Sequence, residues 1–253
     1  MDQMLSGERQ ALIGERLARD GRVIAADIAI ELAVSEDTIR RDLRDMARAG
    51  LCRRVYGGAL PAAPASAPLA ERADTPEKAR LAAKAVELVI PGSVVFIDAG
   101  STNAAIARAL PHDLGVTIVT NAPTIAVSLL GHKRAEVILV GGRLDKEKGA
   151  VLGARALSEI ARLRPDLAFL GACGVDAAAG VTAFSFEEAE IKRALAEASR
   201  SVAVAATADK LGTAAPFAVL DAGRLTHLVV PAEAGPAAGA AWAACGTRLH
   251  IAG

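Results

Sequence analysis

Asp98 to Asn103 carry residue types that are typical of a phosphate-binding loop. They read Asp-Ala-Gly-Ser-Thr-Asn and stand between a short apolar run and an alanine-rich helical stretch. Gly100 permits close backbone approach, Ser101 and Thr102 offer hydroxyls, and a helix start offers unpaired N–H groups at the positive end of its dipole. The alternative is an ordinary strand-to-helix connection with N-cap chemistry, which uses the same residue types.

Polar or glycine-rich residues also follow four later apolar runs. In a parallel sheet such strand ends share one edge, where ligands gather. Lys210 is the point cation that a phosphate would need, unless it is only a solvated loop lysine. Asp98 and Asn121 suit sugar hydroxyls. The predicted effector-binding residues are Asp98, Gly100, Ser101, Thr102, Asn103, Thr120, Asn121, Gly141, Gly142, Gly171, Gly174, Glu188 and Lys210.

The helix start that holds Glu188 is rich in charge. Glu187, Glu190 and Lys192 surround it, and carboxylates in a first turn complement the helix dipole. We therefore interpret most of this charge, including Lys192, as a solvated face, and Glu188 alone as a site candidate.

A second set of functional side chains is basic and helical. Ser35 is a good N-cap for a helix that continues to Arg48 and stops before Gly50. One stripe of this helix is apolar and the opposite stripe is mostly arginine, which binds phosphate oxygens or the guanine edge in the major groove. The alternative is a solvated charged face. The predicted DNA-binding residues are Ser35, Thr38, Arg40, Arg41, Arg44, Arg48, Arg53 and Arg54.

The elements around this helix favour DNA binding. A helix from Ala25 to Leu32 precedes it after a tight turn, and a third helix, about Glu8 to Arg19, completes a helix-turn-helix bundle. Two short strands joined by Gly57-Gly58 follow, which predicts a wing carrying Arg53 and Arg54.

Composition bounds the remaining possibilities. The 253 residues are 52% hydrophobic, only 3% aromatic, and carry no net charge, which argues against single-strand binding and against a general polyanion binder. The spacing of the three cysteines and four histidines indicates no metal site or disulfide, and we expect no cofactor. Without a signal peptide or a membrane-spanning run, we expect a cytoplasmic protein.

The chain divides at a Pro/Ala-rich run. We expect a DNA-binding domain at residues 1–60, a linker at 61–75 and an α/β domain with a mainly parallel sheet at 76–253. A helix is expected at Pro76 to Ile90 and another at Ala104 to Leu110. The expected strands are Val94–Ile97, Val116–Thr120, Val137–Val140, Leu167–Leu170, Val202–Ala206, Leu225–Val230 and Arg248–Ile251.

Two stretches resemble the DeoR family of bacterial transcription regulators. The family's Ser-x-x-Thr-Ile-Arg-Arg-Asp-Leu stands here as Ser35 to Leu43, followed by Gly50 and the Gly-Gly wing. Its Asp-Ala-Gly-Thr-Thr stands as Asp98 to Thr102, its Thr-Asn as Thr120-Asn121, its Gly-Gly as Gly141-Gly142 and its Gly-x-x-Gly as Gly171 to Gly174.

The resemblance implies a winged helix-turn-helix joined to a larger α/β effector domain that is similar in fold to ribose-5-phosphate isomerase and binds phosphorylated sugars. The family's Asp-x-Ser-Lys appears here as Thr207-Ala208-Asp209-Lys210, which keeps only the lysine. The aspartate that often precedes the second glycine of the family's Gly-x-x-Gly is replaced here by Cys173. Sugar specificity therefore cannot be carried over from better-known members.

The leading prediction is a regulator, and not an enzyme, that represses a carbohydrate-use operon under control of a sugar phosphate. Its expected partners are double-stranded operator DNA, the phosphorylated sugar and at least one further copy of the chain, because one winged helix offers a small interface. Two alternatives are a sugar-phosphate isomerase or lactone hydrolase with an added helical domain, and a winged-helix adaptor that binds protein.

Overall fold

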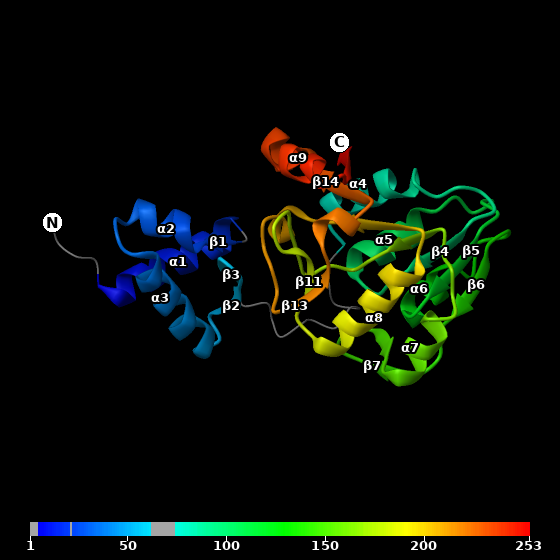
Figure 1. The fold of residues 1–253 in the computed structure, drawn as a ribbon, viewed down its shortest axis with the longest axis horizontal. Helices are drawn as coiled ribbons and strands as arrows, with labels where there is room; N and C mark the ends of the chain where they lie inside the picture. Colours follow the sequence, from blue (N-terminus) through cyan, green and yellow to red (C-terminus); the bar gives the residue numbers. More distant parts are fainter. Residues whose placement is uncertain (1–4, 21, 62–73) are drawn as a thin grey trace.

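The computed structural model describes residues 5–20, 22–61 and 74–253, so most of the predicted linker lies outside the described residues. Figure 1 shows α1 to α3 and β1 to β3 at one end of the molecule and the later elements at the other. No helix of the described chain is long and apolar enough to cross a bilayer.

The first part is a three-helix bundle with a small antiparallel sheet. Its helices are α1 (Ser6–Asp20), α2 (Ala25–Glu31) and α3 (Glu36–Arg48), and its strands, in the order β1-β3-β2, are β1 (Val23–Ile24), β3 (Gly58–Pro61) and β2 (Cys52–Val55). Ile13, Ile39, Leu43 and Met46 fill its core. Gly58 is required because an added Cβ would lie 1.9 Å from the Val23 carbonyl oxygen. The helix-turn-helix and wing predictions are confirmed, and β1 is an additional strand.

The second part is built on a seven-stranded parallel sheet in the order β15-β14-β12-β9-β4-β5-β6. All seven of its strands were predicted, within two residues at each end. They are β4 (Val94–Ile97), β5 (Thr117–Thr120), β6 (Glu136–Leu139), β9 (Leu167–Phe169), β12 (Ser201–Ala205), β14 (His227–Pro231) and β15 (Arg248–Ala252).

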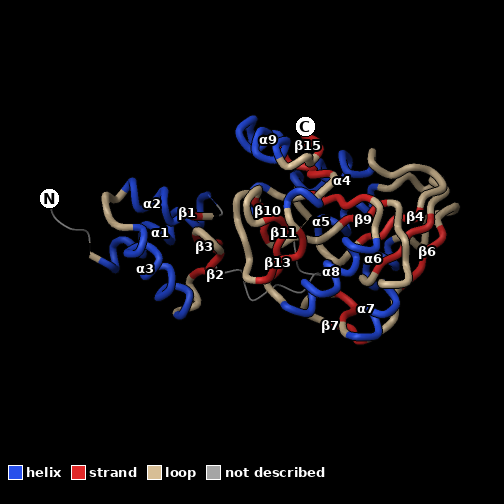
Figure 2. The backbone as a smooth tube through the Cα atoms, viewed as in Figure 1, coloured by secondary structure: helices blue, strands red, loops and turns tan. Residues whose placement is uncertain are grey.

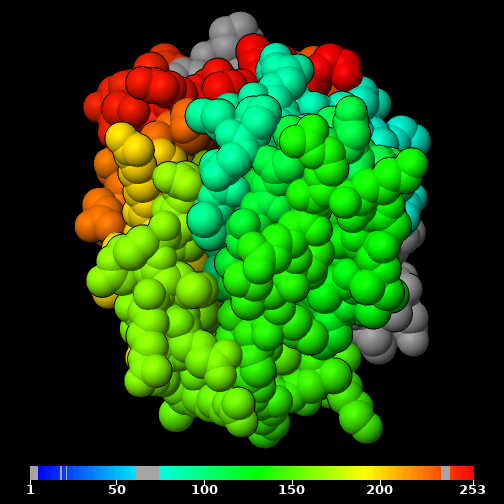
Figure 3. Space-filling model, turned by 90° about the vertical axis from the view of Figure 1, so that its right-hand side faces the viewer, coloured from blue at the N-terminus to red at the C-terminus, as the bar shows by residue number. Residues whose placement is uncertain are grey.

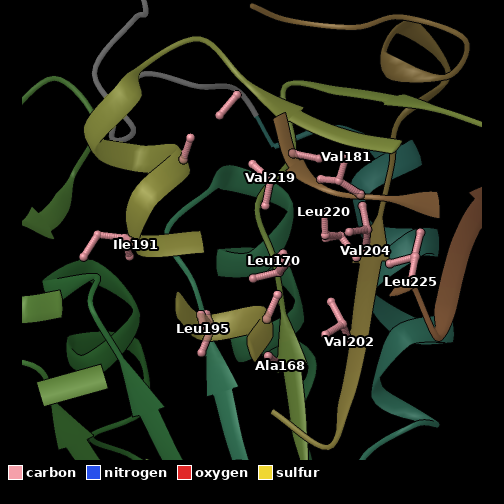
Figure 4. Close-up of a cluster of buried hydrophobic side chains, with 14 of the residues drawn as sticks. Ala168, Leu170, Val181, Ile191, Leu195, Val202, Val204, Val219, Leu220 and Leu225 are labelled. Atoms are coloured by element: carbon pink, nitrogen blue, oxygen red, sulfur yellow. The ribbon is translucent and has the colours of Figure 1, made fainter. Parts of the chain in front are cut away.

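Helices cover both faces of this sheet, because its strands are apolar on both sides. One face packs beneath α4 (Pro76–Val86), α5 (Ser101–Ala109) and α6 (Pro123–Ser128), while the other contacts α7 (Ala154–Ile160), α8 (Phe186–Ala198) and α9 (Gly235–Ala244). Figure 4 shows part of the core on this second face, where Leu195 of α8 lies near Ala168 and Leu170. Val202 and Val204 of β12 lie across from them.

Two smaller sheets were not predicted. One is the hairpin β7 (Arg143–Asp145) with β8 (Ala150–Leu152); the other consists of β10 (Gly174–Asp176), β11 (Gly180–Ala183) and β13 (Phe217–Leu220), in that order. Every residue of β11 is buried, so it lacks the alternation that marks a half-exposed strand. Figure 2 shows β10, β11 and β13 on the side of the larger part that faces β2 and β3.

The predicted helix limits also needed correction. The helix expected from Pro76 to Ile90 ends at Val86. The one expected from Ala104 starts three residues earlier, at Ser101. Ser, Thr and Asn are poor in helix interiors, but they satisfy a first turn, where side chains compete least with the backbone ladder.

Candidate functional site

The basic helix α3 is capped and oriented as its pattern predicts. The Ser35 Oγ accepts a hydrogen bond from the Thr38 N–H at 3.1 Å, and Ile39, Leu43 and Met46 are buried. On the opposite side the four predicted arginines are exposed, namely Arg40, Arg41, Arg44 and Arg48. This side can meet a nucleic-acid surface without disturbing the core.

A buried ion pair fixes α3 against α1. Asp42 accepts hydrogen bonds from the Arg9 Nε at 2.7 Å and Nη2 at 3.2 Å, and from the Ser6 Oγ at 2.7 Å. Asp42 is on the buried side of a helix whose other side is basic. The pair therefore sets the angle at which the exposed arginines are held.

The two wing arginines lie in different places. Arg54 is exposed and, with Arg40, lines a notch of about 240 Å³ between α3 and the wing. Arg53 is half-buried, and its Cζ lies 3.7 Å from the centroid of the Phe184 ring in the second part of the chain. Arg54 is thus exposed on the wing, while Arg53 contacts the second part of the chain.

A small pocket opens where the loops after β4 and β9 meet. The sheet order reverses direction between these strands, which is the position where ligands bind in open α/β sheets. Its volume is about 40 Å³, enough for about three water molecules. The lining residues are Ala99, Gly100, Ser101, Thr102, Asn103, Leu170, Gly171, Ala172, Cys173, Glu188, Lys192, Ala205 and Lys210.

One wall of the pocket is the N-terminus of α5. The first helical hydrogen bond runs from the Ala104 N–H to the Gly100 carbonyl at 2.8 Å, so the preceding N–H groups have no acceptor within the helix. Gly100 has a φ of +152°, which side chains rarely adopt. The Asn103 side chain donates to the carbonyl oxygens of Asp98 and Phe169, at 2.8 and 3.2 Å, and holds the loop in shape.

Lys210 also lines the pocket and sits at the end of a short 3-10 turn, Ala208–Lys210. The Thr213 hydroxyl donates to its carbonyl oxygen at 2.8 Å, which ties the turn to the following loop. The predicted pairing of a helix N-terminus with Lys210 is therefore present as a geometric arrangement.

The pocket contains a second lysine that the sequence prediction placed in solvent. Lys192 is 3% exposed and forms an ion pair with Asp98, which is 1% exposed. Burial acts to lower the pKa of Lys192, but the Asp98 and Glu188 carboxylates together with the hydrogen bond to Asp98 raise the pKa, so the ammonium stays charged. The solvated-face interpretation of Lys192 is wrong. Its spacing from the buried residues Ala189 and Leu195, three residues on either side, is the signal that was missed.

Asp98 itself is less available than predicted. Besides the ion pair with Lys192, its Oδ2 accepts the Gly171 N–H at 3.0 Å. An added Cβ at Gly171 would lie 2.4 Å from the Ala99 carbonyl oxygen, so glycine is required for this close approach. Asp98 thus joins the loops after β4 and β9 and neutralises Lys192, instead of presenting an open carboxylate to sugar hydroxyls.

Besides Asp98, five predicted residues do not line the pocket. The Thr120 hydroxyl donates to the Ile97 carbonyl oxygen at 2.6 Å, and the Asn121 Oδ1 accepts the Ala99 N–H at 3.2 Å, so both support the loop from behind. Gly141 and Gly142 follow the edge strand β6, two strands away from β4, and Gly174 begins β10. The prediction assumed that all strand ends converge, whereas only central ones do.

No group of three His, Cys, Asp or Glu side chains in the described chain is arranged to hold a metal ion. The pocket lining instead carries the start of α5, the lysines Lys192 and Lys210 and the carboxylate of Glu188.

Among solved structures, the chain is similar to the sorbitol operon regulator SorC from Klebsiella pneumoniae, with 13% identity, a TM-score of 0.44, and coverage of 92% of this chain and 97% of that chain. It is also similar to ribose 5-phosphate isomerase A from Methanocaldococcus jannaschii, with 19% identity, a TM-score of 0.39 and 53% coverage of each chain.

Relatives of known description are closer in sequence. The glycerol-3-phosphate regulon repressor of Escherichia coli is 35% identical over 83% of this chain and 84% of its own. The transcriptional regulator GlpR of Haloferax volcanii is 36% identical over 83% of both chains. A repressor described as that of the aga operon in Escherichia coli O157:H7 is 29% identical over 89% of this chain and 86% of its own.

Family models match both parts of the chain in order. Residues 9–63 match the DeoR-like helix-turn-helix domain, and residues 73–231 match the DeoR C-terminal sensor domain. The first range holds α3 and the wing, and the second holds the pocket. The chain therefore belongs to the DeoR family of transcriptional regulators.

Proposed function

We propose that this chain represses a carbohydrate-use operon and is controlled by a phosphorylated sugar. The observation that carries the proposal is the pocket between the N-terminus of α5 and Lys210, in the same chain as the arginine face of α3. Both family matches are to domains of transcriptional regulators, so they support this function over the alternative of an isomerase or lactone hydrolase. The regulator would act in the cytoplasm on double-stranded operator DNA.

The division of labour follows the two parts of the fold. We assign DNA binding to residues 1–60 and effector binding and oligomerisation to residues 76–253, with 61–75 as the linker. Each of the first two ranges has a hydrophobic core of its own.

The effector is expected to bind through its phosphoryl group. Helix N–H groups and the Lys210 ammonium favour a dianion over a neutral hydroxyl, while the charge of Lys192 is already balanced by Asp98. The pocket lies where the loops after β4 and β9 meet, so the carbon skeleton would extend over these loops. Glycerol 3-phosphate is the first compound to test, because a relative with 35% identity is named the glycerol-3-phosphate regulon repressor.

Lys210→Ala should weaken binding of the phosphorylated ligand, and Gly100→Val should abolish it, because a side chain at a φ of +152° strains the loop that approaches the phosphate. Isothermal titration would compare sugar phosphates with the corresponding free sugars. At about 100 times the dissociation constant, the ligand should add roughly 2.7 kcal/mol of stability.

Lys133→Ala, which removes an exposed lysine far from the pocket lining, is the matched control. Equal binding of free and phosphorylated sugars, or full binding by Lys210→Ala, would refute the site and leave the DNA-binding assignment standing.

A second copy of the chain is expected to bind at the free edge of the sheet. The N–H groups of Glu136 and Val140 donate to β5, so the alternating ladder turns the backbone groups of Val137 and Leu139 outward. Figure 3 shows this side of the molecule, where the green segment contains β5, α6 and β6. Its exposed apolar residues are Val127, Leu130, Ile138 and Leu139, exposed by 65, 80, 42 and 47%.

A further inference from the structure

The wing contacts the sensor part of the chain through both backbone and side-chain groups. The Tyr56 N–H donates to the Ala214 carbonyl oxygen at 2.7 Å, which forms an isolated antiparallel bridge. The Arg53 guanidinium lies over the ring of Phe184, and Arg22 lies so near Gly212 that an added Cβ there would be 3.4 Å from its Nη1. We name the surface formed by Phe184, Gly212 and Ala214 the wing dock.

The wing dock shares a loop with the pocket. Lys210 lines the pocket, and four residues later Ala214 accepts the hydrogen bond from the wing. Between them, the Thr213 hydroxyl donates to the Lys210 carbonyl oxygen at 2.8 Å, and the Gly212 N–H donates to Val175 at 2.8 Å. The loop is therefore bonded along its length and has few ways to move one end alone.

A second path runs through the buried Thr182. Its carbonyl oxygen accepts the N–H of the pocket residue Cys173 at 3.0 Å, and its hydroxyl accepts the Ala215 N–H at 2.8 Å while donating to Gly174 at 3.2 Å. An added Cβ at Gly174 would be 2.5 Å from the Thr213 carbonyl oxygen, so β10 and the loop that holds Thr213 are in close contact. Phe184 follows Thr182 by two residues, which connects the pocket wall to the ring that holds Arg53.

Docking limits what Arg53 can do on DNA. Arg53 is half-buried between the wing and the Phe184 ring, 3.7 Å from the ring centroid, and its Nε is buried, so a DNA phosphate reaches this guanidinium fully only when the wing leaves the dock. DNA-bound and docked positions of Arg53 are therefore competing states of the same side chain.

We propose that the wing dock is a binding surface for the chain's own wing, and that a phosphate held at Lys210 stabilises the docked wing and so withholds Arg53 from DNA. The second half rests on the proposed effector site. A ligand that fixes Lys210 favours the loop arrangement in which Ala214 accepts the wing, and it shifts the equilibrium by its difference in affinity for the two states.

The first experiment measures the affinity for operator DNA of the wild type, Phe184→Ala, Arg53→Ala and the double variant. The operator duplex is first selected from random duplexes by binding to the wild-type chain. Phe184→Ala should bind about two- to fivefold more tightly, as a released cation–π contact of this kind implies. Its salt dependence should steepen by about one phosphate contact. In the double variant this gain should disappear.

Phe186→Ala is the matched control, because this exposed phenylalanine is only two residues away and contacts Phe217 instead of the wing. Phe184→Leu keeps the apolar volume without the ring face, so it should behave as Phe184→Ala even if the smaller residue harms folding. Wild-type affinity in both Phe184 variants, or an equal cost of Arg53→Ala in both backgrounds, would overturn the docking.

The second experiment follows hydrogen exchange with inorganic phosphate as the probe. In wild type, phosphate should slow the exchange of the loop amides 207–215 and of the wing amides 53–57 together. In Phe184→Ala it should slow exchange in the loop but not in the wing. In Lys210→Ala it should slow exchange in neither segment. Protection of the loop without the wing in wild type would overturn the coupling while leaving the effector site intact. Protection of neither would overturn the effector site itself.

Discussion

The four arginines of α3 differ in what they already bind. Arg40 donates to Glu36 at 2.7 Å, one turn earlier, and Arg48 pairs with Asp45 at 3.5 Å. Within residues 5–20, 22–61 and 74–253, Arg41 and Arg44 form no ion pair, so they reach DNA without first releasing a carboxylate. We therefore expect the sequence-specific contacts to come from these two.

Arg41→Ala and Arg44→Ala should each weaken operator binding by about 1–3 kcal/mol if the arginine contacts a base edge. The loss should be smaller on random DNA, because phosphate contacts carry no sequence information. Titration of operator and random duplexes measures both. Arg19→Ala, on the exposed side of α1, is the control, and unchanged affinity in folded Arg41 or Arg44 variants would exclude that residue.

His132 should make the protein less stable in mild acid. It is 9% exposed, and its two ring nitrogens have no hydrogen-bond partner among the described residues. Burial, with a smaller contribution from the nearby His112, lowers the pKa of His132. Below about pH 6.5 the unfolded chain therefore binds a proton that the folded chain resists, so stability is present above that pH and declines as the pH falls.

His132→Leu should flatten the fall in the free energy of unfolding between about pH 7 and pH 5, measured by thermal and denaturant unfolding at several pH values. Identical slopes for wild type and variant would mean that His132 titrates normally in the folded protein.

At the scale of elements, the contact between α1 and α3 is the most sensitive to a single change. Asp42→Ala leaves the buried guanidinium of Arg9 without its carboxylate, which should cost about 3–5 kcal/mol of the stability of the winged part. Exchange of α1 and α3 amides reports this locally. The double variant Arg9→Met, Asp42→Leu removes both charges and should recover most of the loss; an equal loss in both would point to packing instead of charge.

The elements also show what could be predicted from the sequence. The parallel strands were predictable because each is a continuous apolar run, and Ser35 marked the start of α3 because capping is local. Strand order is not local, which is why Gly141 and Gly142 were predicted to lie with Asp98 although β6 is the edge strand. Lys192 was misplaced for a similar reason, since only the Asp98 side chain, 94 residues away, makes its burial tolerable.

At the scale of the whole molecule, assembly should depend on the β6 edge. Leu139→Lys places a charge among the exposed apolar residues and should shift the protein toward monomers, because charged edges oppose strand pairing. Sedimentation at micromolar concentration measures this. Operator affinity should fall in parallel, since two linked half-sites bind more tightly than one.

Glu147→Gln, on the exposed turn after β7, changes the net charge by the same amount as Leu139→Lys and is the matched charge control. A wild-type chain that is strictly monomeric at these concentrations, yet binds a half-site tightly, would contradict the expected dimer.

If the proposed coupling holds, the bond between Tyr56 and Ala214 makes DNA a regulator of the proposed effector site. If phosphate at Lys210 disfavours the wing position that DNA requires, then bound DNA must lower the affinity for the sugar phosphate by the same factor. The metabolite level at which half of the repressor responds is therefore higher for molecules seated on an operator than for those free of DNA. The dose–response threshold of the operon is thus set jointly by the pocket and by the strength of the operator it controls.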